Sequence, residues 1–283
     1  MFDIKEHTVV LLSDVDVEIY RLLTSTPSRV ADAAKYHLSA GGARIRAQLG
    51  IHAAAALNLS PKVAMACALA PELLHNASLI HDDLQDGDEV RRDTPTVWSQ
   101  YGKDVAISTG DLLISAAYMA IANHPDPAAA LGAVHHAVTV TIDGQTQDCR
   151  TKCPTPERWA TIAALKSGPL IALPISLALI AAKVQGQDTA IRAGNALAVA
   201  YQTLDDIEDR DSDLAMGGTN ICLSLEAIGN APVSAKNIAC DRAYAALLTA
   251  CELANSLPSN AGASLATLAS LLESKLRDID HAT

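Results

Sequence analysis

The sequence predicts an all-α fold, a helical bundle forming a single domain over residues 1–283. Hydrophobic residues make up 49% of the chain and aromatic residues only 3%, so alanine and leucine must do most of the packing. Both residues favour helix over strand. Apolar residues recur at spacings of three and four, which is typical of helices with one buried face, and no stretch alternates as a strand does. Segments such as HPDP and CPTP are typical of turns between helices.

Two long helices are predicted most clearly. One is expected to begin after Ser60, where Ser-Pro supplies an N-cap and a proline at the first helical position, and to end at Gly87. The other is expected to begin at Asp188 as its N-cap and to end near Arg210. The full set of expected helices, which includes these two, covers about 14–38, 43–58, 60–86, 104–123, 127–148, 155–182, 188–210, 233–256 and 261–279.

Composition and charge exclude several classes of function. The chain has 21 basic and 32 acidic residues, a net charge of −11, which argues against nucleic acid or an anionic membrane as partner. The longest apolar run, Leu170–Ala182, has 13 residues, whereas a membrane span needs roughly 20. The N-terminus lacks the basic and apolar regions of a secretory signal. We therefore expect a cytoplasmic protein with reduced thiols, in which Cys149 and Cys153 are close together but have no further ligands for zinc.

Two aspartate-rich motifs carry the functional signal. The segment DDLQD contributes Asp82, Asp83 and Asp86, and the segment DDIED contributes Asp205, Asp206 and Asp209. Residues four apart on a helix differ by about 40° in direction, so the first and last aspartates of each motif point the same way. Such like charges repel each other at a helix end that is already negative, and a hard divalent cation such as Mg²⁺ compensates them. The alternative is that each motif is a solvated acidic helix end, but both follow apolar helices.

Polar residues beside the motifs strengthen this interpretation. His75 lies seven residues before Asp82 and shares its helix face, and Gln202 lies three residues before Asp205. Arg91 and Arg92 follow the first motif directly. Aspartates, a histidine and two arginines in this order are typical of a site for a metal ion and a diphosphate.

The chain resembles the trans-isoprenyl diphosphate synthases, the polyprenyl synthetase family. ELLHNASLIHDD with LQD and RRDTPTVW (72–98) is similar to the first aspartate-rich region of that family, and YQTLDDIED (201–209) is similar to the second. TGDLLISAAY (109–118), GQTQD (144–148) and LKSGPL (165–170) resemble further motifs in the family's order, and GGARIRA (41–47) resembles its GGKRxRP-like segment. The resemblance spans about residues 40–215.

The resemblance implies an isoprenoid synthase bundle around a central cavity, usually a homodimer, that joins isopentenyl diphosphate head to tail to an allylic diphosphate. It implies about three Mg²⁺ ions, for which Mn²⁺ can substitute, held by the six aspartates. Arg91 and Lys166 would bind the allylic diphosphate, and Arg46, Arg92 and His75 the isopentenyl diphosphate. Gln202 and the Lys166–Ser167 segment would face the developing cation. The catalytic residues implied are Asp82, Asp83, Asp86, Lys166, Gln202 and Asp205.

The chain departs from the family's pattern at three charged or turn positions. Ala43 and Gly218 replace lysines, the first beside isopentenyl diphosphate and the second beside the metal and the allylic diphosphate, and Asp93 replaces a glycine. These losses bear on whether isopentenyl diphosphate is the second substrate.

Product length is expected to depend on the residues below the first motif. The family's large aromatic four or five residues before the first aspartate is replaced by Ser78 and Ala77. We therefore expect a product of C20 or longer, with Leu74, Tyr118 and Met119 as candidate floors of the cavity.

Three other functions remain open at this level. A class I terpene cyclase or irregular-coupling synthase shares the metal trigger, although DDIED stands where the usual NDxxSxxxE motif of cyclases would be. A non-catalytic partner subunit of a heteromeric synthase is expected to have lost aspartates, and all six are present. A di-metal carboxylate bundle, suggested by Glu72-x-x-His75, needs a second ExxH motif, which the sequence lacks.

Overall fold

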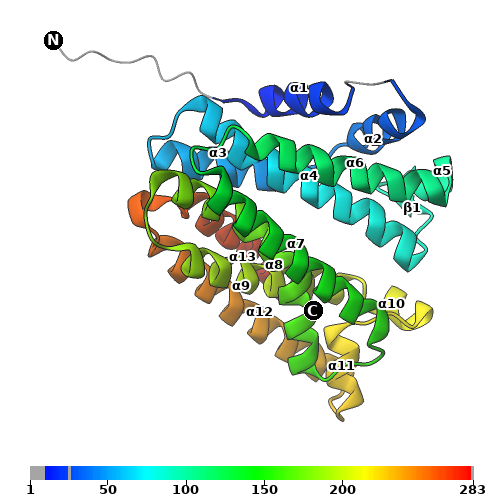
Figure 1. Cartoon of the computed structure of the whole chain (residues 1–283). Coiled ribbons are helices and arrows are strands. Elements are labelled where there is room, and N and C mark those ends of the chain that lie inside the picture. The colour runs from blue at the N-terminus through cyan, green and yellow to red at the C-terminus, as the bar shows by residue number, and fades with distance from the viewer. Residues whose placement is uncertain (1–9, 25–26, 282–283) are drawn as a thin grey trace. The chain divides into compact units, whose positions relative to one another are not determined.

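The computed structural model describes residues 10–24 and 27–281, and within them it confirms the all-α prediction. The only strands described form one two-stranded hairpin. In order, the elements are α1 (Leu12–Leu23), α2 (Arg29–Ser39), α3 (Ile45–Ala56), α4 (Pro61–Asp86), β1 (Val90–Arg91), β2 (Thr94–Pro95), α5 (Val97–Tyr101), α6 (Lys103–Ile121), α7 (Pro127–Arg150), α8 (Pro156–Ala182), α9 (Gln187–Glu208), α10 (Arg210–Met216), α11 (Ile221–Ala227), α12 (Pro232–Asn255), the 3₁₀ turn η1 (Pro258–Asn260) and α13 (Ala263–His281) (Figure 1).

The chain divides into two compact units. The first unit comprises the described residues up to His135 together with Pro174–Gln185, and the second comprises His136–Leu173 and the described residues from Gly186 onward. The single domain over residues 1–283 stays a prediction.

Helices α4 and α6 form the centre of the first unit, where they pack along each other (Figure 1). Helix α3 packs on α4, and α2 packs on α6. The approach of α3 to α4 is close because Gly50 has no side chain: a Cβ at this position would lie 2.4 Å from the carbonyl oxygen of Cys67. Gly50 therefore allows the short distance between α3 and α4, the helix that ends in the first aspartate motif.

Helices α9 and α12 form the centre of the second unit, and α13 packs on α12 (Figure 1). A cluster of buried side chains joins α8, α11 and α12, with Trp159 as its largest member and Ile221 and Leu225 beside it. This cluster lies under the end of α9 that carries the second aspartate motif, because Val199 and Ile207 pack against it.

Several predicted helix boundaries need correction. The helix expected over 14–38 is two helices, because Pro27 precedes a new N-cap at Ser28, whose hydroxyl accepts a hydrogen bond from the backbone N–H of Ala31 at 3.1 Å. Residues 25–26 lie outside the described residues, as do residues 1–9, where the absence of a secretory signal was predicted. Helix α9 begins after Gly186, so Asp188 lies in its first turn rather than at its N-cap.

The two ends of α4 agree with the sequence. Pro61 is its first residue, and it stops at Gly87, which has a left-handed backbone (φ 79°). The elements that the sequence did not predict are short: the hairpin β1–β2, α5, α10, α11 and η1. Two to seven residues carry too little periodicity to be read, and tertiary contacts hold such segments in place.

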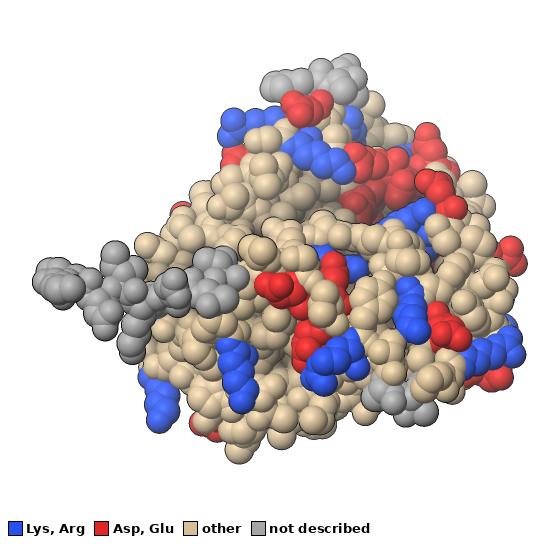
Figure 2. All heavy atoms as spheres, turned by 90° about the horizontal axis from the view of Figure 1, so that it is seen from above, with Lys and Arg blue, Asp and Glu red and all other residues tan. Residues whose placement is uncertain are grey.

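Three helices, α4, α6 and α8, are long and apolar enough to cross a membrane by length and composition. Their most apolar stretches are 72%, 50% and 78% buried inside the protein, respectively. The absence of a membrane span, which rested on the longest uninterrupted apolar run, stays a prediction. Uncharged residues cover most of the face in Figure 2, and no continuous basic stripe crosses that face.

The close approach of α3 and α4 gives a test of the fold. Gly50→Ala is expected to lower the free energy of unfolding by roughly 1–3 kcal/mol, because the methyl group meets backbone atoms that cannot turn away. Gly132→Ala in α7 is the matched control, since a Cβ there meets nothing within 4 Å, and it is expected to stabilise by about 0.5–1 kcal/mol. Urea unfolding followed by circular dichroism measures both, and equal stabilities would contradict the close approach.

Candidate active site

The first aspartate motif lies at the C-terminal end of α4, and its three carboxylates have different surroundings. The N–H groups of Gly87 and Asp88 both donate to the carbonyl oxygen of Asp83, which closes the helix. The side chain of Asp83 is buried, that of Asp82 is half-buried, and that of Asp86 is exposed. The middle aspartate of the motif therefore points into the protein, while the first and last remain accessible.

Asp83 is held by Arg91 of the hairpin. The Nε of Arg91 donates to the Oδ1 of Asp83 at 2.6 Å, while Arg91 itself pairs with Thr94 across the hairpin. The turn between the strands places Arg92 and Asp93 in the left-handed region, at φ 52° and φ 58°. Aspartate tolerates this conformation better than most residues, so Asp93 can form the turn without the glycine expected there.

The Asp83 carboxylate is short of partners in this arrangement. Burial raises the pKa of Asp83 more than the neighbouring Arg91 lowers it. Its Oδ2 is buried and accepts no hydrogen bond from any described residue. A buried carboxylate oxygen without a partner is unfavourable, and a nearby cation would relieve it.

Cationic side chains gather around two histidines in the same unit. Burial lowers the pKa of His75 well below its usual value, and the positive charges of Arg46 and Arg92 lower it further. Burial likewise lowers the pKa of His37 to about 4, although the hydrogen bond from its Nε2 to the Oδ1 of Asn76 opposes this shift; the charges of Arg91, Arg92 and Arg44 lower the pKa further. Both histidines are neutral near pH 7, so the positive charge of this region resides on the arginines.

Arg92 lies against the glycine loop before α3. Its guanidinium donates to the carbonyl oxygen of Gly41, and a Cβ on Gly42 would lie 2.8 Å from its Nη1. The exposed Ala43 follows directly in the chain. A guanidinium therefore lies beside the position where a lysine was expected, and the region keeps a cation there.

The Glu72 carboxylate is committed to holding α3 and so does not support a di-metal carboxylate site. Its Oε2 accepts from the backbone N–H of Ala47 at 3.2 Å, and its Oε1 accepts from Asn76 at 3.3 Å. The Nη1 of Arg44 lies 4.0 Å from the same Oε1. These contacts make Glu72 a structural partner of the α3 N-terminus.

The second aspartate motif repeats the arrangement of the first at the end of α9. Asp206 is buried, Asp205 is half-buried, and Asp209 is exposed. Both carboxylate oxygens of Asp206 accept hydrogen bonds, Oδ1 from the Gln202 amide at 2.9 Å and Oδ2 from the backbone N–H of Ile221 at 2.6 Å. Gln202 was expected to face the developing cation, but in the structure its amide donates a hydrogen bond to the middle aspartate of the motif.

Burial dominates the titration of this motif. It raises the pKa of Asp206 to about 7, although both hydrogen bonds oppose the rise. It also raises the pKa of Asp205 to about 6, where Lys275 of α13 lowers the value and Asp209 raises it. The metal-free motif is therefore poorly stabilised as a set of anions, which is the condition a divalent cation relieves.

Lys166 and Gln202 line the same small hollow in the second unit, together with Asp148, Trp159 and Thr219. The Nζ of Lys166 donates to the Oδ2 of Asp148 at 2.7 Å. Helices α7 and α8 approach closely enough for this contact because of Gly144, where a Cβ would lie 2.4 Å from the backbone nitrogen of Lys166. The neighbouring Ser167 is half-buried, and its substrate contact stays a prediction.

The predicted site residues therefore form two groups, one in each unit. The first unit holds Arg46, His75, Asp82, Asp83, Asp86, Arg91 and Arg92, and the second holds Lys166, Ser167, Gln202, Asp205, Asp206 and Asp209. Sequence reasoning missed His37, Asp148, Asn220 and Lys275, which lie on other elements and reach the motifs only through packing. Asp148 left a signal as the last residue of the GQTQD segment, and Asn220 left one as an N-cap residue before an apolar run.

The donors present fit a hard divalent cation. Among residues 10–24 and 27–281 no group of three or more His, Cys, Asp or Glu side chains forms a cage that could hold a metal ion. Mg²⁺ does not need one, because it binds through one or two carboxylates and completes its shell with water and substrate phosphates. Asp82 with Asp86, and Asp205 with Asp209, offer such pairs one helical turn apart.

Comparison with known sequences gives one consistent result. A sequence profile described as polyprenyl synthetase matches residues 27–224. The (2E,6E)-farnesyl diphosphate synthase of Mycobacterium tuberculosis is 34% identical over 173 residues, covering 59% of this chain and 48% of that protein. The short chain isoprenyl diphosphate synthase of Methanothermobacter thermautotrophicus is 31% identical over 200 residues, covering 66% of this chain and 60% of that protein. The matched region thus spans about half to three fifths of these relatives.

Solved structures agree in fold. Geranylgeranyl pyrophosphate synthetase from Pyrococcus horikoshii is similar with a TM-score of 0.82 and 26% identity, over 92% of this chain and 94% of that one. A decaprenyl diphosphate synthase from Rhodobacter capsulatus has a TM-score of 0.85 at 17% identity, over 94% of this chain and 96% of that one, which shows the shared fold alone. The isoprenoid synthase fold expected from the motifs is confirmed.

The raised pKa of Asp206 predicts how stability depends on pH without metal. Because the folded pKa of about 7 exceeds the usual 3.8, the group's contribution is fully present below pH 4 and is lost as the pH rises through 7. Asp206→Asn removes this titration. The free energy of unfolding of the variant, relative to that of the wild type, is therefore expected to rise by roughly 2–4 kcal/mol between about pH 4 and about pH 7. Denaturant unfolding in chelator at each pH measures it. The exposed Asp209→Asn is the control, and parallel curves for wild type and Asp206→Asn would contradict the prediction.

Proposed function

Because this chain belongs to the polyprenyl synthetase family, we propose that it is a trans-isoprenyl diphosphate synthase, which joins isopentenyl diphosphate head to tail to an allylic diphosphate. One observation carries the proposal. In both aspartate motifs the middle carboxylate is buried and held by the protein, while the first and last carboxylates remain accessible at the helix end. This leaves the pairs Asp82–Asp86 and Asp205–Asp209 to meet cations and a diphosphate.

The accessible carboxylates are proposed to hold Mg²⁺, with Mn²⁺ as a substitute, and Asp83 and Asp206 to fix their directions. The metal, when bound, neutralises the diphosphate so that it can leave the allylic carbon. Arg91 holds Asp83 through Nε, which leaves its terminal nitrogens to donate to the allylic diphosphate. Lys166, held by Asp148, is proposed to bind the same diphosphate, with the neighbouring Ser167 facing the developing cation.

The isopentenyl diphosphate is proposed to bind at the cationic region of the first unit. Arg46, Arg92 and the neutral His75 supply donors, with Arg44 nearby. Guanidinium groups bind phosphate oxygens in pairs and keep their charge at any physiological pH. The guanidinium of Arg92 beside Ala43 supports isopentenyl diphosphate as the second substrate despite the missing lysine.

A product of C20 or longer is proposed from the residues below Asp82. Ala77 is buried and Ser78 is half-buried, so no large ring stands one turn below the motif. Leu74 and Tyr118 remain candidate floors of the cavity.

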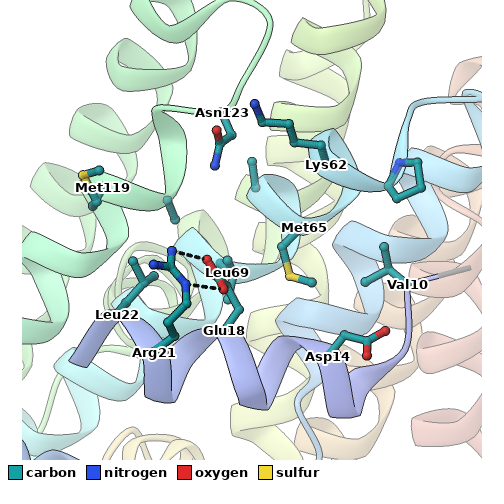
Figure 3. A pocket seen from close by; sticks show the side chains of 13 residues that line it. Val10, Asp14, Glu18, Arg21, Leu22, Lys62, Met65, Leu69, Met119 and Asn123 are labelled. Carbon is teal, nitrogen blue, oxygen red and sulfur yellow. Dashed lines mark hydrogen bonds and ion pairs between the residues drawn. The ribbon is translucent and has the colours of Figure 1, made fainter. Parts of the chain in front are cut away.

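Met119 does not fit as a floor. It is 62% exposed and lines a separate pocket of about 380 Å³ between α1, α4 and α6, whose rim carries the Glu18–Arg21 ion pair (Figure 3). Leu69 lines that pocket too, and it lies five residues before Leu74, so the two side chains point about 140° apart on α4. Met119 belongs to the face of the helices turned away from Leu74.

The assembly and location are also proposed. Exposed apolar residues on α6 and at the start of α7, Ile107, Met119 and Leu131, support a homodimer, since such a surface is normally covered. None of the six cysteines, all of which lie within the described residues, forms a disulfide, and Cys149 and Cys153 are exposed, which supports a reducing cytoplasmic location. The acidic net charge of −11 supports small anionic substrates bound through metal rather than nucleic acid.

The test is incubation of the purified protein with Mg²⁺, labelled isopentenyl diphosphate and each allylic diphosphate in turn. An elongated diphosphate is expected, and it is expected to vanish in chelator. Asp82→Ala and Asp205→Ala are each expected to lower kcat by about a thousandfold or more, because each removes an accessible carboxylate from the metal. The exposed Asp104→Ala at the start of α6 is the control. Released hydrocarbon would indicate a cyclase, and no turnover with any allylic partner would indicate a silent subunit.

Product length has its own test. Ala77→Phe is expected to shorten the main product by one or more isoprene units, because the ring fills the space one turn below Asp82. Lys62→Phe places the same ring on the exposed start of α4 and is expected to leave the product unchanged. Chromatography of the dephosphorylated products separates the lengths, and a wild-type product that already stops at C15 would contradict the argument.

A further inference from the structure

A buried asparagine outside both aspartate motifs ties the second motif to the elements that follow it. Asn220 is 1% exposed and is the N-cap of α11. Its Nδ2 donates to the backbone carbonyl of Asp206 at 2.6 Å and to the Oδ2 of Asp213 at 2.8 Å. Its Oδ1 accepts from the N–H of Cys222 at 2.8 Å. One side chain thus joins the end of α9 to α10 and α11.

The hydrogen bond from Asn220 to Asp206 satisfies a backbone carbonyl group at the C-terminal end of α9. The last four carbonyl groups of an α-helix have no partner within the helix, and the carbonyl of Asp206 is one of them. The next residue, Ile221, donates its own N–H to the Asp206 carboxylate at 2.6 Å. Consecutive residues of one segment therefore hold both the backbone and the side chain of the motif's middle aspartate.

We infer that Asn220 is a positioning residue for the cation site of the second aspartate motif. By fixing the end of α9 it fixes the directions of Asp205, in the last turn, and of Asp209, the C-cap residue that follows that turn. This inference rests on the proposed function, because it concerns the proposed metal site. A change at Asn220 should therefore weaken metal binding without touching any carboxylate.

The competing explanation is that Asn220 only caps α11. Asn220→Asp separates the two, because aspartate is as good an N-cap as asparagine and has nearly the same shape. The variant keeps the bonds to α11 but loses both donated bonds, and it sets a carboxylate against Asp213 and the Asp206 carbonyl. Charge alone predicts tighter cation binding from an added carboxylate, whereas loss of positioning predicts weaker binding.

Asn230 offers a matched control at the other end of α11. Its Nδ2 donates to the carbonyl oxygen of Leu225 at 2.8 Å, which serves the same helix. Asn230→Asp makes the same change in charge and also removes a donor to a helix carbonyl. Effects common to the two variants report on α11, and effects specific to Asn220→Asp report on the aspartate motif.

The measurement is Mn²⁺ binding to the full chain in the presence of inorganic diphosphate, with free Mn²⁺ counted by electron paramagnetic resonance. Asn220→Asp is expected to weaken Mn²⁺ binding roughly 10- to 100-fold, while Asn230→Asp stays close to wild type. Equal or tighter binding by Asn220→Asp would overturn the inference. Absence of Mn²⁺ binding by the wild type would instead overturn the proposed function. If Asn220→Asp does not fold, Asn220→Ser, which also caps and adds no charge, is measured in its place with the same expectation.

Discussion

Burying a carboxylate at the negative end of a helix is unfavourable unless other groups compensate its charge. Both aspartate motifs contain such a carboxylate, and the contacts around each motif compensate it. Asp83 lies in the last turn of α4 and Asp206 in the last turn of α9, and both are almost fully buried. Each therefore needs partners from another element. The first unit supplies a guanidinium from the hairpin, and the second supplies an amide and a backbone N–H.

Because these partners hold the middle aspartate of each motif, the first and last carboxylates remain accessible. A helix places residues four apart on one side, so once the middle aspartate of DDxxD turns inward, the first and last turn outward together. The exposed Asp86 and Asp209 and the half-buried Asp82 and Asp205 follow from this geometry. The same sequence spacing that makes each motif repulsive thus supplies a pair of oxygen donors suited to a cation. The hairpin and α11, which the sequence did not predict, hold the middle aspartate of each motif.

The sequence was sufficient for the features that depend on local chemistry. The apolar spacing predicted the long helices, Pro61 and Gly87 predicted both ends of α4, and the motifs predicted the family. It failed where a segment is held by distant contacts. Asn220 and the N-terminus of α11 depend on meeting α9, and the neutral state of His37 depends on burial between α2 and α4. Neither the hydrogen bond to Asp206 nor the burial of His37 has a signature in the residues nearby.

The positions of the arginines in the structure change how the missing lysine at Ala43 is interpreted. A lysine is a flexible point charge, whereas Arg92 reaches the glycine loop from a hairpin turn with fixed backbone angles. Because burial, reinforced by the nearby arginines, keeps His37 and His75 neutral, the cationic charge of the first unit resides on groups that do not titrate near pH 7. An anion binding there would meet the same charge throughout the physiological range of pH. The loss of a lysine at Ala43 therefore changes the shape of the cationic surface more than it changes its sign.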